Sequence, residues 1–248
     1  TANTLSASGA TINDAAGNVS TLTQAAVAAS TSHKVDTTVP TVSIAASSTS
    51  LRSGQTSTLT FTLSEAATDF VVGDITVSGG TLSSFAGSGS SYTVVFTPTA
   101  NTQSGTGSIS VASGAFSDAA GNSNSASSTT SITYDTQVPS VSSITASRST
   151  LKSWDTSVFT ITLSEASTDF VEGDVTFSGE TLSSFTAVSG TSYTVVFTPT
   201  ANTQSGSGSV SVASGAFTDA AGNSNTASSA TTNTYDTQAP TVSITASA

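Results

Sequence analysis

The sequence of 248 residues has no cysteine and no methionine, one histidine and one tryptophan. Without cysteine the chain has no thiol nucleophile, no disulfide bond and no cysteine-ligated zinc. A Ser-His-Asp triad would have to use His33, which lies beside Lys34 in a polar stretch with no G-x-S-x-G context. We therefore expect His33 to be a solvated linker residue and the protein not to be an enzyme.

Basic residues are also scarce. Four Lys and Arg oppose fifteen Asp and Glu, which gives a formal net charge of −11. Proteins that neutralise nucleic-acid phosphates or bind anionic membranes need the opposite sign. No apolar run approaches the roughly 20 residues that cross a bilayer. We expect no nucleic-acid partner and no direct membrane insertion.

What the sequence does contain is a repeat of about 100 residues. Residues 64–85 match residues 164–185 at 17 of 22 positions, and residues 91–128 match residues 192–229 at 34 of 38. The linker D-T-x-x-P begins at Asp36, Asp135 and Asp236. We therefore predict two complete repeats, 36–134 and 135–235. The flanks would be the carboxyl-terminal fragment of a preceding repeat, 1–35, and the start of a following one, 236–248.

Apolar residues within each repeat alternate with Ser and Thr at period two, which is typical of strands with one buried face. Leu59, Phe61 and Leu63 should point to one side, and Tyr92, Val94 and Phe96 follow the same pattern. About seven short strands in 100 residues indicate an all-β fold, an antiparallel sandwich of immunoglobulin type without the antibody cysteines. Two such sandwiches in tandem would form an elongated rod.

The only tryptophan, Trp154, takes the place that Gly54 has in the first repeat. We expect Trp154 to pack at a turn or against a neighbouring domain rather than to form a platform for sugar stacking.

Acidic residues concentrate where the predicted topology brings the chain to one pole of each sandwich. The linker starts there, the second strand ends there at S-E-A, and the loop after the sixth strand carries D-A-A-G-N. The expected cluster is Asp36, Glu65, Asp69, Asp74 and Asp118 in the first repeat, and Asp135, Glu165, Asp169, Asp174 and Asp219 in the second.

Five carboxylates gathered in this way would repel one another, so a compensating cation is expected. Calcium accepts six to eight oxygen ligands in flexible geometry, whereas magnesium requires a stricter octahedron. We therefore predict structural Ca²⁺ at these residues. Other roles stay open: Asp118 and Asp219 also suit Asx-turns before glycine, and the linker and loop acids also suit turn and strand-start positions.

The pattern D-T-x-x-P-x-V, S-E-A, D-F-x-x-x-D-[IV]-T, T-P-T and D-A-A-G-N resembles the bacterial Ig-like domains of large repetitive surface adhesins and biofilm-associated proteins. The resemblance covers both complete repeats. It implies calcium at domain junctions, held by Asp36, Glu65 and Asp118 and by Asp135, Glu165 and Asp219. The first fragment departs from the pattern by its greater length, with 22 rather than 17 residues between Asp14 and the linker Asp36, so the resemblance does not assign Asp14 as a ligand.

The resemblance and the acidic pole together predict a non-enzymatic extender. Calcium would stiffen tandem domains that project a distal adhesive domain from the bacterial cell surface, with neighbouring repeats of the chain as partners. The adhesive target stays unknown. The alternatives are a module that binds glycan or ice through loops or threonine rows, or an accessory domain of a secreted enzyme or phage fibre.

Overall fold

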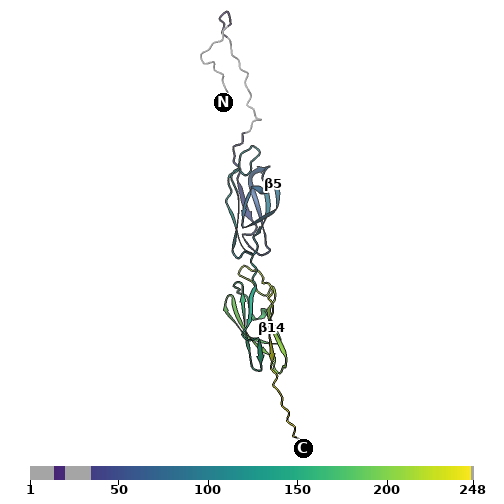
Figure 1. Cartoon of the computed structure of the whole chain (residues 1–248). Coiled ribbons are helices and arrows are strands. Elements are labelled where there is room, and N and C mark those ends of the chain that lie inside the picture. Colours follow the sequence, from purple (N-terminus) through teal and green to yellow (C-terminus); the bar gives the residue numbers. More distant parts are fainter. Residues whose placement is uncertain (1–13, 20–34, 247–248) are drawn as a thin grey trace. The chain divides into compact units, whose positions relative to one another are not determined.

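The computed structural model describes residues 14–19 and 35–246 (Figure 1). The chain divides into two compact units, Thr1–Thr37 and Thr38–Ala248, and each is considered by itself. Described residues of the first unit include a turn that follows Asp14. His33 and most of the predicted fragment 1–35 lie outside the described residues. The second unit holds all the named strands.

The first β-sandwich pairs a sheet of order β1-β3-β5 with a sheet of order β2-β7-β6-β4. The strands are β1 (Val42–Ala46), β2 (Ser50–Arg52), β3 (Ser57–Ala67), β4 (Ile75–Ser78), β5 (Gly80–Pro98), β6 (Gly105–Val111) and β7 (Thr130–Asp135). A single 3₁₀ turn, η1 (Val72–Asp74), precedes β4.

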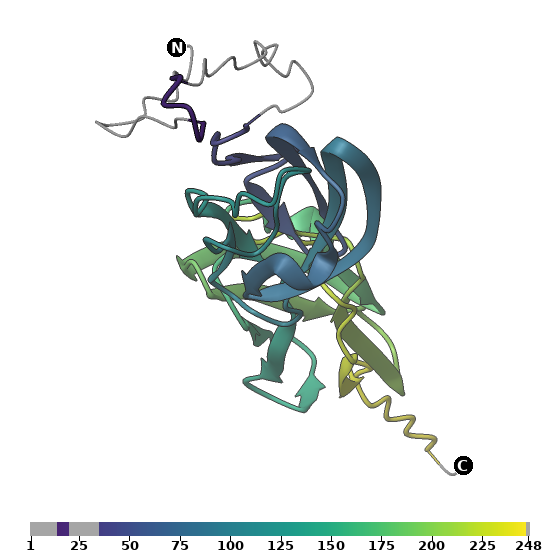
Figure 2. The same ribbon diagram turned by 90° about the horizontal axis from the view of Figure 1, so that it is seen from above.

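The second β-sandwich repeats this arrangement with sheets β12-β13-β10-β8 and β11-β14-β15-β9. Its elements are β8 (Val141–Ala146), β9 (Thr150–Lys152), β10 (Ser157–Leu163), η2 (Glu172–Asp174), β11 (Val175–Ser178), β12 (Glu180–Ser189), β13 (Ser192–Pro199), β14 (Gly206–Val212) and β15 (Thr231–Asp236). Strands account for nearly all the regular structure of both sandwiches (Figures 1 and 2).

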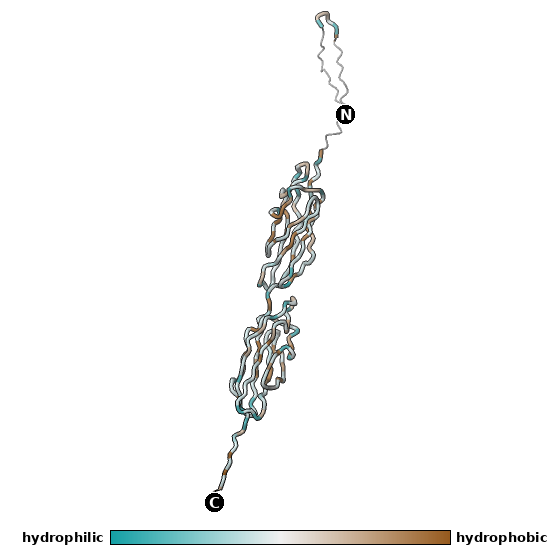
Figure 3. Tube along the Cα trace, turned by 90° about the vertical axis from the view of Figure 1, so that its right-hand side faces the viewer, coloured by the Kyte–Doolittle hydropathy of each residue, from teal (hydrophilic) through white to brown (hydrophobic). Residues whose placement is uncertain are grey.

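Alternation of side chains builds the two cores. In β3, Leu59, Phe61 and Leu63 are buried while the threonines between them are exposed or half-buried. Brown and pale positions accordingly alternate along the strands in Figure 3. Both sheets contribute to each core: Phe61 and Phe96 come from one sheet of the first sandwich, and Ile109 and Ile132 from the other. The predicted all-β Ig-like sandwiches are confirmed.

Two details of topology differ from the sequence-based expectation. The pairs β2–β7 and β9–β15 are parallel, whereas the other ladders are antiparallel. The short strands β2 and β9 were not predicted, because three residues with a single buried leucine give no periodic signal. Their place matters for the site, since β2 pairs with the end of β7 at Asp135.

Candidate metal centre at the junction of the two repeats

The loop that carries D-A-A-G-N in the second repeat closes around the carboxylate of Asp219. Its Oδ1 accepts hydrogen bonds from the backbone N–H of Ala221 and of Asn223, at 2.9 and 2.8 Å, and its Oδ2 accepts one from Nδ2 of Asn223 at 2.8 Å. Gly222 provides the left-handed backbone, with φ of 83°, that this tight turn requires. The five residues therefore form a rigid Asx-type loop.

The same loop recurs in both other copies. Oδ1 of Asp118 accepts from the N–H of Ala120 and of Asn122, and Oδ1 of Asp14 accepts from the N–H of Ala16 and of Asn18. The Asn122 side chain, which donates to Oδ2, lowers the pKa of Asp118. The Asx-turn reading is therefore correct for this motif, and it leaves carboxylate lone pairs available for a cation.

Two buried side chains fix the loop onto the second sandwich. Phe217 is 1% exposed and packs edge to face against Phe170. Asn225, 3% exposed, accepts a hydrogen bond from the N–H of Phe217 and donates to the carbonyls of Ala213 and Thr226. The position of Asp219 is therefore set by the core.

The linker between the sandwiches is held at both ends. The Oγ1 of Thr136 donates to the carbonyl of Thr99, and its N–H donates to the carbonyl of Thr102, both in the first sandwich. Three residues later, the carbonyl of Pro139 accepts from the N–H of Thr226 in the second sandwich. Only Gln137 and Val138 lie between these two attachments.

Asp135 is the last residue of β7 in the first sandwich, but its carboxylate lies beside residues of the second sandwich. Asp135, Glu165 and Asp219 each offer a carboxylate oxygen, and these oxygens lie within 4.8 Å of one another. Glu165 and Asp219 are each 6% exposed, and Asp135 is half-buried. Residues of two sandwiches thus meet in one acidic cluster, which we call the junction cluster.

Burial and mutual repulsion disfavour the charged forms of the carboxylates in the junction cluster. Burial, followed by the charges of Asp219 and Asp135, raises the pKa of Glu165. Burial, and secondarily the charge of Asp219, raises the pKa of Asp135. Oε1 of Glu165 is buried and accepts no hydrogen bond. Within the described residues, the one salt bridge joins Arg148 and Asp155, outside the cluster.

These features fit a bound calcium ion. A buried carboxylate oxygen without a donor is satisfied by a cation, and three converging carboxylates are a hard oxygen donor set. Calcium takes six to eight oxygens, so carbonyls and water would complete the shell. Asp135, Glu165 and Asp219 are therefore the residues that would hold the ion.

Other predicted ligands of the second repeat have different partners. Burial raises the pKa of Asp169, but hydrogen bonds from Oγ of Ser167 and then from the N–H and Oγ1 of Thr218 lower it below its ordinary value. Oδ2 of Asp174 accepts from the N–H of Val171 and closes the turn η2. Neither belongs to the junction cluster.

The first repeat shows the same division. Carboxylate oxygens of Glu65 and Asp118 lie within 4.8 Å of each other. Asp69 instead binds the N–H and Oγ of Ser117, and Asp74 binds the N–H of Val71. Asp36 is exposed and belongs to the first unit, which is considered by itself.

Sequence reasoning missed the amides that organise the site, namely Asn225 and its counterpart Asn124, the bridging Asn223, and Gln103. A signal was present, because D-A-A-G-N-S-N and A-N-T-Q-S-G recur in both repeats. Amides carry no charge and therefore did not stand out beside the acids.

No helix among the described residues is long and apolar enough to span a membrane.

The fold and the junction cluster define a protein of tandem Ig-like β-sandwiches with an acidic cluster where the two sandwiches meet. The model of the bacterial Ig-like domain matches residues 36–134 and again residues 135–235, so the chain belongs to that family. None of the curated proteins matches it.

The solved structures to which the chain is similar include bacterial adhesins. The Escherichia coli adhesin FdeC is 17% identical with a TM-score of 0.43, over 78% of this chain and 63% of that one. The Yersinia pseudotuberculosis adhesin InvE is 17% identical with a TM-score of 0.29, over 78% and 58%. Three Ig domains of titin are 12% identical with a TM-score of 0.37, over 80% and 65%. The chain thus spans less than two thirds of the length of each.

Proposed function

We propose that the chain is a non-enzymatic extender segment of a bacterial surface adhesin, in which calcium stiffens the junctions between tandem Ig-like domains. One observation carries this proposal. Asp135 is covalently part of β7 in the first sandwich, while Glu165 and Asp219 belong to the second. An ion bound by all three carboxylates would tie the last strand of one domain to the next domain.

The mechanism is mechanical. Only Gln137 and Val138 separate the two attachments of the linker, and the N–H of Gln137 itself donates to Oδ1 of Asp135 at 3.1 Å. Bending at these residues must therefore move Asp135 relative to Glu165 and Asp219. A calcium ion resists that movement because its ligands must stay within coordination distance. Without the ion, mutual repulsion of the carboxylates favours opening of the junction. Extracellular calcium would therefore keep the domains extended, and location at the cell surface is part of the proposal.

The test uses the absence of cysteine. Ser88→Cys and Val188→Cys place one spin label on each sandwich, at exposed positions of β5 and β12. Pulsed electron paramagnetic resonance should give a broad distribution of distances between the two labels in excess chelator and a narrow one in millimolar calcium. Magnesium at the same concentration should leave the distribution broad.

The control is Glu165→Gln in the same labelled chain, which removes one buried ligand and should abolish the narrowing. A distribution equally narrow in chelator and in calcium would contradict calcium stiffening. The junction would then be rigid through its hydrogen bonds alone.

One observation favours a second candidate function, ligand binding. Trp154 lies in the turn between β9 and β10, but it does not pack there as expected: it is 97% exposed and has a left-handed φ of 71°. An exposed aromatic face suits stacking on a sugar ring. Binding of the chain to a glycan array that disappears in Trp154→Ala would support this function. If the chain bound no glycan on the array, only the extender function would remain.

A further inference from the structure

Contacts across the junction reach the loop that holds Asp219. Nη1 of Arg52 donates to the carbonyl of Gly222 at 2.8 Å, and the N–H of Ser53 donates to Oδ1 of Asn223 at 2.7 Å. The approach is close, since a Cβ on Gly222 would lie 2.8 Å from Nη1 of Arg52. The turn after β2 in the first sandwich is thus docked on the D-A-A-G-N loop of the second.

The docked turn is itself ordered. The N–H of Arg52 donates to Oε1 of Gln55 at 3.1 Å, and the N–H of Gln55 donates to the carbonyl of Arg52 at 3.0 Å. The left-handed φ of 77° at Gly54 closes the turn. Its geometry fixes where Arg52 and Ser53 meet the next domain.

Asn223 connects this docking to the junction cluster. Its side chain is 3% exposed, and every polar atom has a role: Oδ1 accepts from Ser53, while Nδ2 donates to Oδ2 of Asp219 and to the carbonyl of Asp135. Removing the first sandwich would leave Oδ1 without this donor and free the amide to rotate.

Glu165 has a partner from the first sandwich as well. The side chain of Gln103, in the loop between β5 and β6, lies near the Glu165 carboxylate and lowers its pKa against the larger effect of burial. Oε1 of Glu165 is buried and accepts no hydrogen bond, so this oxygen stays available to an ion. Gln103, Arg52 and Asp135 also line one cavity, together with Ala221 of the second sandwich.

We infer that Arg52, Ser53 and Gln103 of the first sandwich are positioning residues for calcium in the second, so that the ion binds tightly only when the preceding repeat is docked. The inference rests on the proposed calcium site. Coupling of this kind is reciprocal: docking raises calcium affinity by the same factor by which calcium favours docking. Each junction would then lock as a unit.

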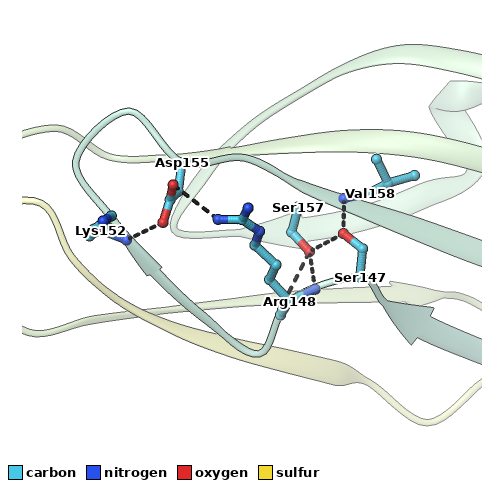
Figure 4. A network of polar contacts seen from close by, with 6 residues as sticks. All are labelled: Ser147, Arg148, Lys152, Asp155, Ser157 and Val158. Carbon is cyan, nitrogen blue, oxygen red and sulfur yellow. Dashed lines mark hydrogen bonds and ion pairs between the residues drawn. The ribbon is translucent and has the colours of Figure 1, made fainter.

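The second sandwich provides matched controls, because it carries the same turn without a described domain beyond it. Lys152 stands at the position of Arg52, and Gln204 at that of Gln103. Figure 4 shows the turn, in which Oδ2 of Asp155 accepts from the N–H of Lys152 while Oδ1 pairs with Arg148 at 3.0 Å. A matched change can therefore be made at the junction, in Arg52 or Gln103, and at the corresponding position of the second sandwich, in Lys152 or Gln204.

The experiment is calorimetric titration of the full chain with calcium, in a Glu65→Gln background that removes a ligand of the other cluster. Gln103→Ala and Arg52→Ala should each raise the calcium dissociation constant roughly 10-fold, as loss of groups that orient ligands commonly does. Gln204→Ala and Lys152→Ala should leave it unchanged. All four changes are at exposed residues, and circular dichroism checks the fold.

The outcomes separate the two proposals. Calcium binding that is equal in all four variants overturns the positioning inference and leaves the calcium site in place. Weakening by Gln204→Ala or Lys152→Ala to the same extent also overturns it, since the effect would then not come from docking. No calcium binding to the Glu65→Gln chain overturns both the inference and the calcium site on which it rests.

Discussion

Glu165 combines deep burial, two acidic neighbours and a carboxylate oxygen without a donor. Its raised pKa means that the folded state disfavours the charged form. The contribution of Glu165 to the free energy of unfolding is therefore fully present below its unfolded pKa and is lost as the pH rises through its higher folded pKa. At neutral pH without metal, Glu165 therefore destabilises the fold.

The effect of Glu165→Gln on the free energy of unfolding should consequently have opposite signs in chelator and in calcium. In excess chelator the substitution should raise the free energy of unfolding by about 1 kcal/mol, the order of one removed repulsive pair. In calcium at about 100 times its dissociation constant it should lose the roughly 2.7 kcal/mol that one site provides. Urea unfolding in the two buffers measures both. Glu172→Gln, the same charge change at an exposed position, should show neither effect.

Asp69 has the opposite electrostatic behaviour. Hydrogen bonds from the Oγ and N–H of Ser117 lower its pKa below the ordinary 3.8. Its stabilising effect is therefore present above pH 3.8 and is lost as the pH falls through the lower folded value.

Asp69→Asn should cost about 1 kcal/mol at pH 7, a modest value because the carboxylate is exposed. It should also reduce the loss of stability between pH 4 and pH 2, measured by denaturant unfolding in chelator. A double-mutant cycle with Ser117→Ala assigns the effect to this contact. Additive losses in the cycle would show that the two residues act independently.

At the scale of single elements, glycine in β14 makes room for an aromatic ring on β15. A Cβ added to Gly206 would lie 2.1 Å from Cε2 of Tyr235, whose hydroxyl donates to the carbonyl of Gly179. Gly206→Ala should displace the ring and cost about 1–3 kcal/mol, as overpacking does. Thermal unfolding measures it. Gly173→Ala, with nothing near its Cβ, is the control, and an equal loss there would contradict the steric explanation.

Strand-level structure was predictable wherever one face is buried along several residues. The alternation in Ser57–Ala67 and Ser192–Pro199 is read directly from the sequence, and the structure confirms it. The first half of β5 was not predicted, because Gly80–Pro98 begins with a stretch rich in Ser and Gly in which only Leu82 and Phe85 are large apolar residues. A strand of this kind depends on its hydrogen bonds to neighbouring strands rather than on an alternation of apolar residues in its own sequence.

The candidate site was predictable to the extent that it depends on charge. Acids are rare in the repeat, so their convergence followed from topology, and Asp135, Glu165 and Asp219 do come together. The hydrogen bonds of Asp69 and Asp169 to Ser117 and Thr218 did not follow, since they depend on loop geometry. The role of Gln103 depends on the approach of a second domain and is absent from the pattern of one repeat.

Across the whole molecule, fifteen acidic residues face four Lys and Arg. Net repulsion destabilises a compact state, and salt screens exposed charges over a Debye length of about 10 Å at 0.1 M. Added sodium chloride should therefore raise the melting temperature in chelator. Buried charges are screened less, so the junction cluster should keep part of its repulsion even in high salt.

This difference separates general screening from a specific ion. In chelator, raising sodium chloride from 0.02 to 0.5 M, a range spanning Debye lengths of roughly 20 to 4 Å, should raise the melting temperature by only a few degrees. Millimolar calcium, which adds almost no ionic strength, should raise it further because it is coordinated by Asp135, Glu165 and Asp219. Scanning calorimetry in both salts, with magnesium at equal ionic strength, makes the comparison. If sodium chloride alone reproduced the full effect of calcium, the carboxylates would need only diffuse counterions, and stiffening would have to come from the hydrogen-bonded linker.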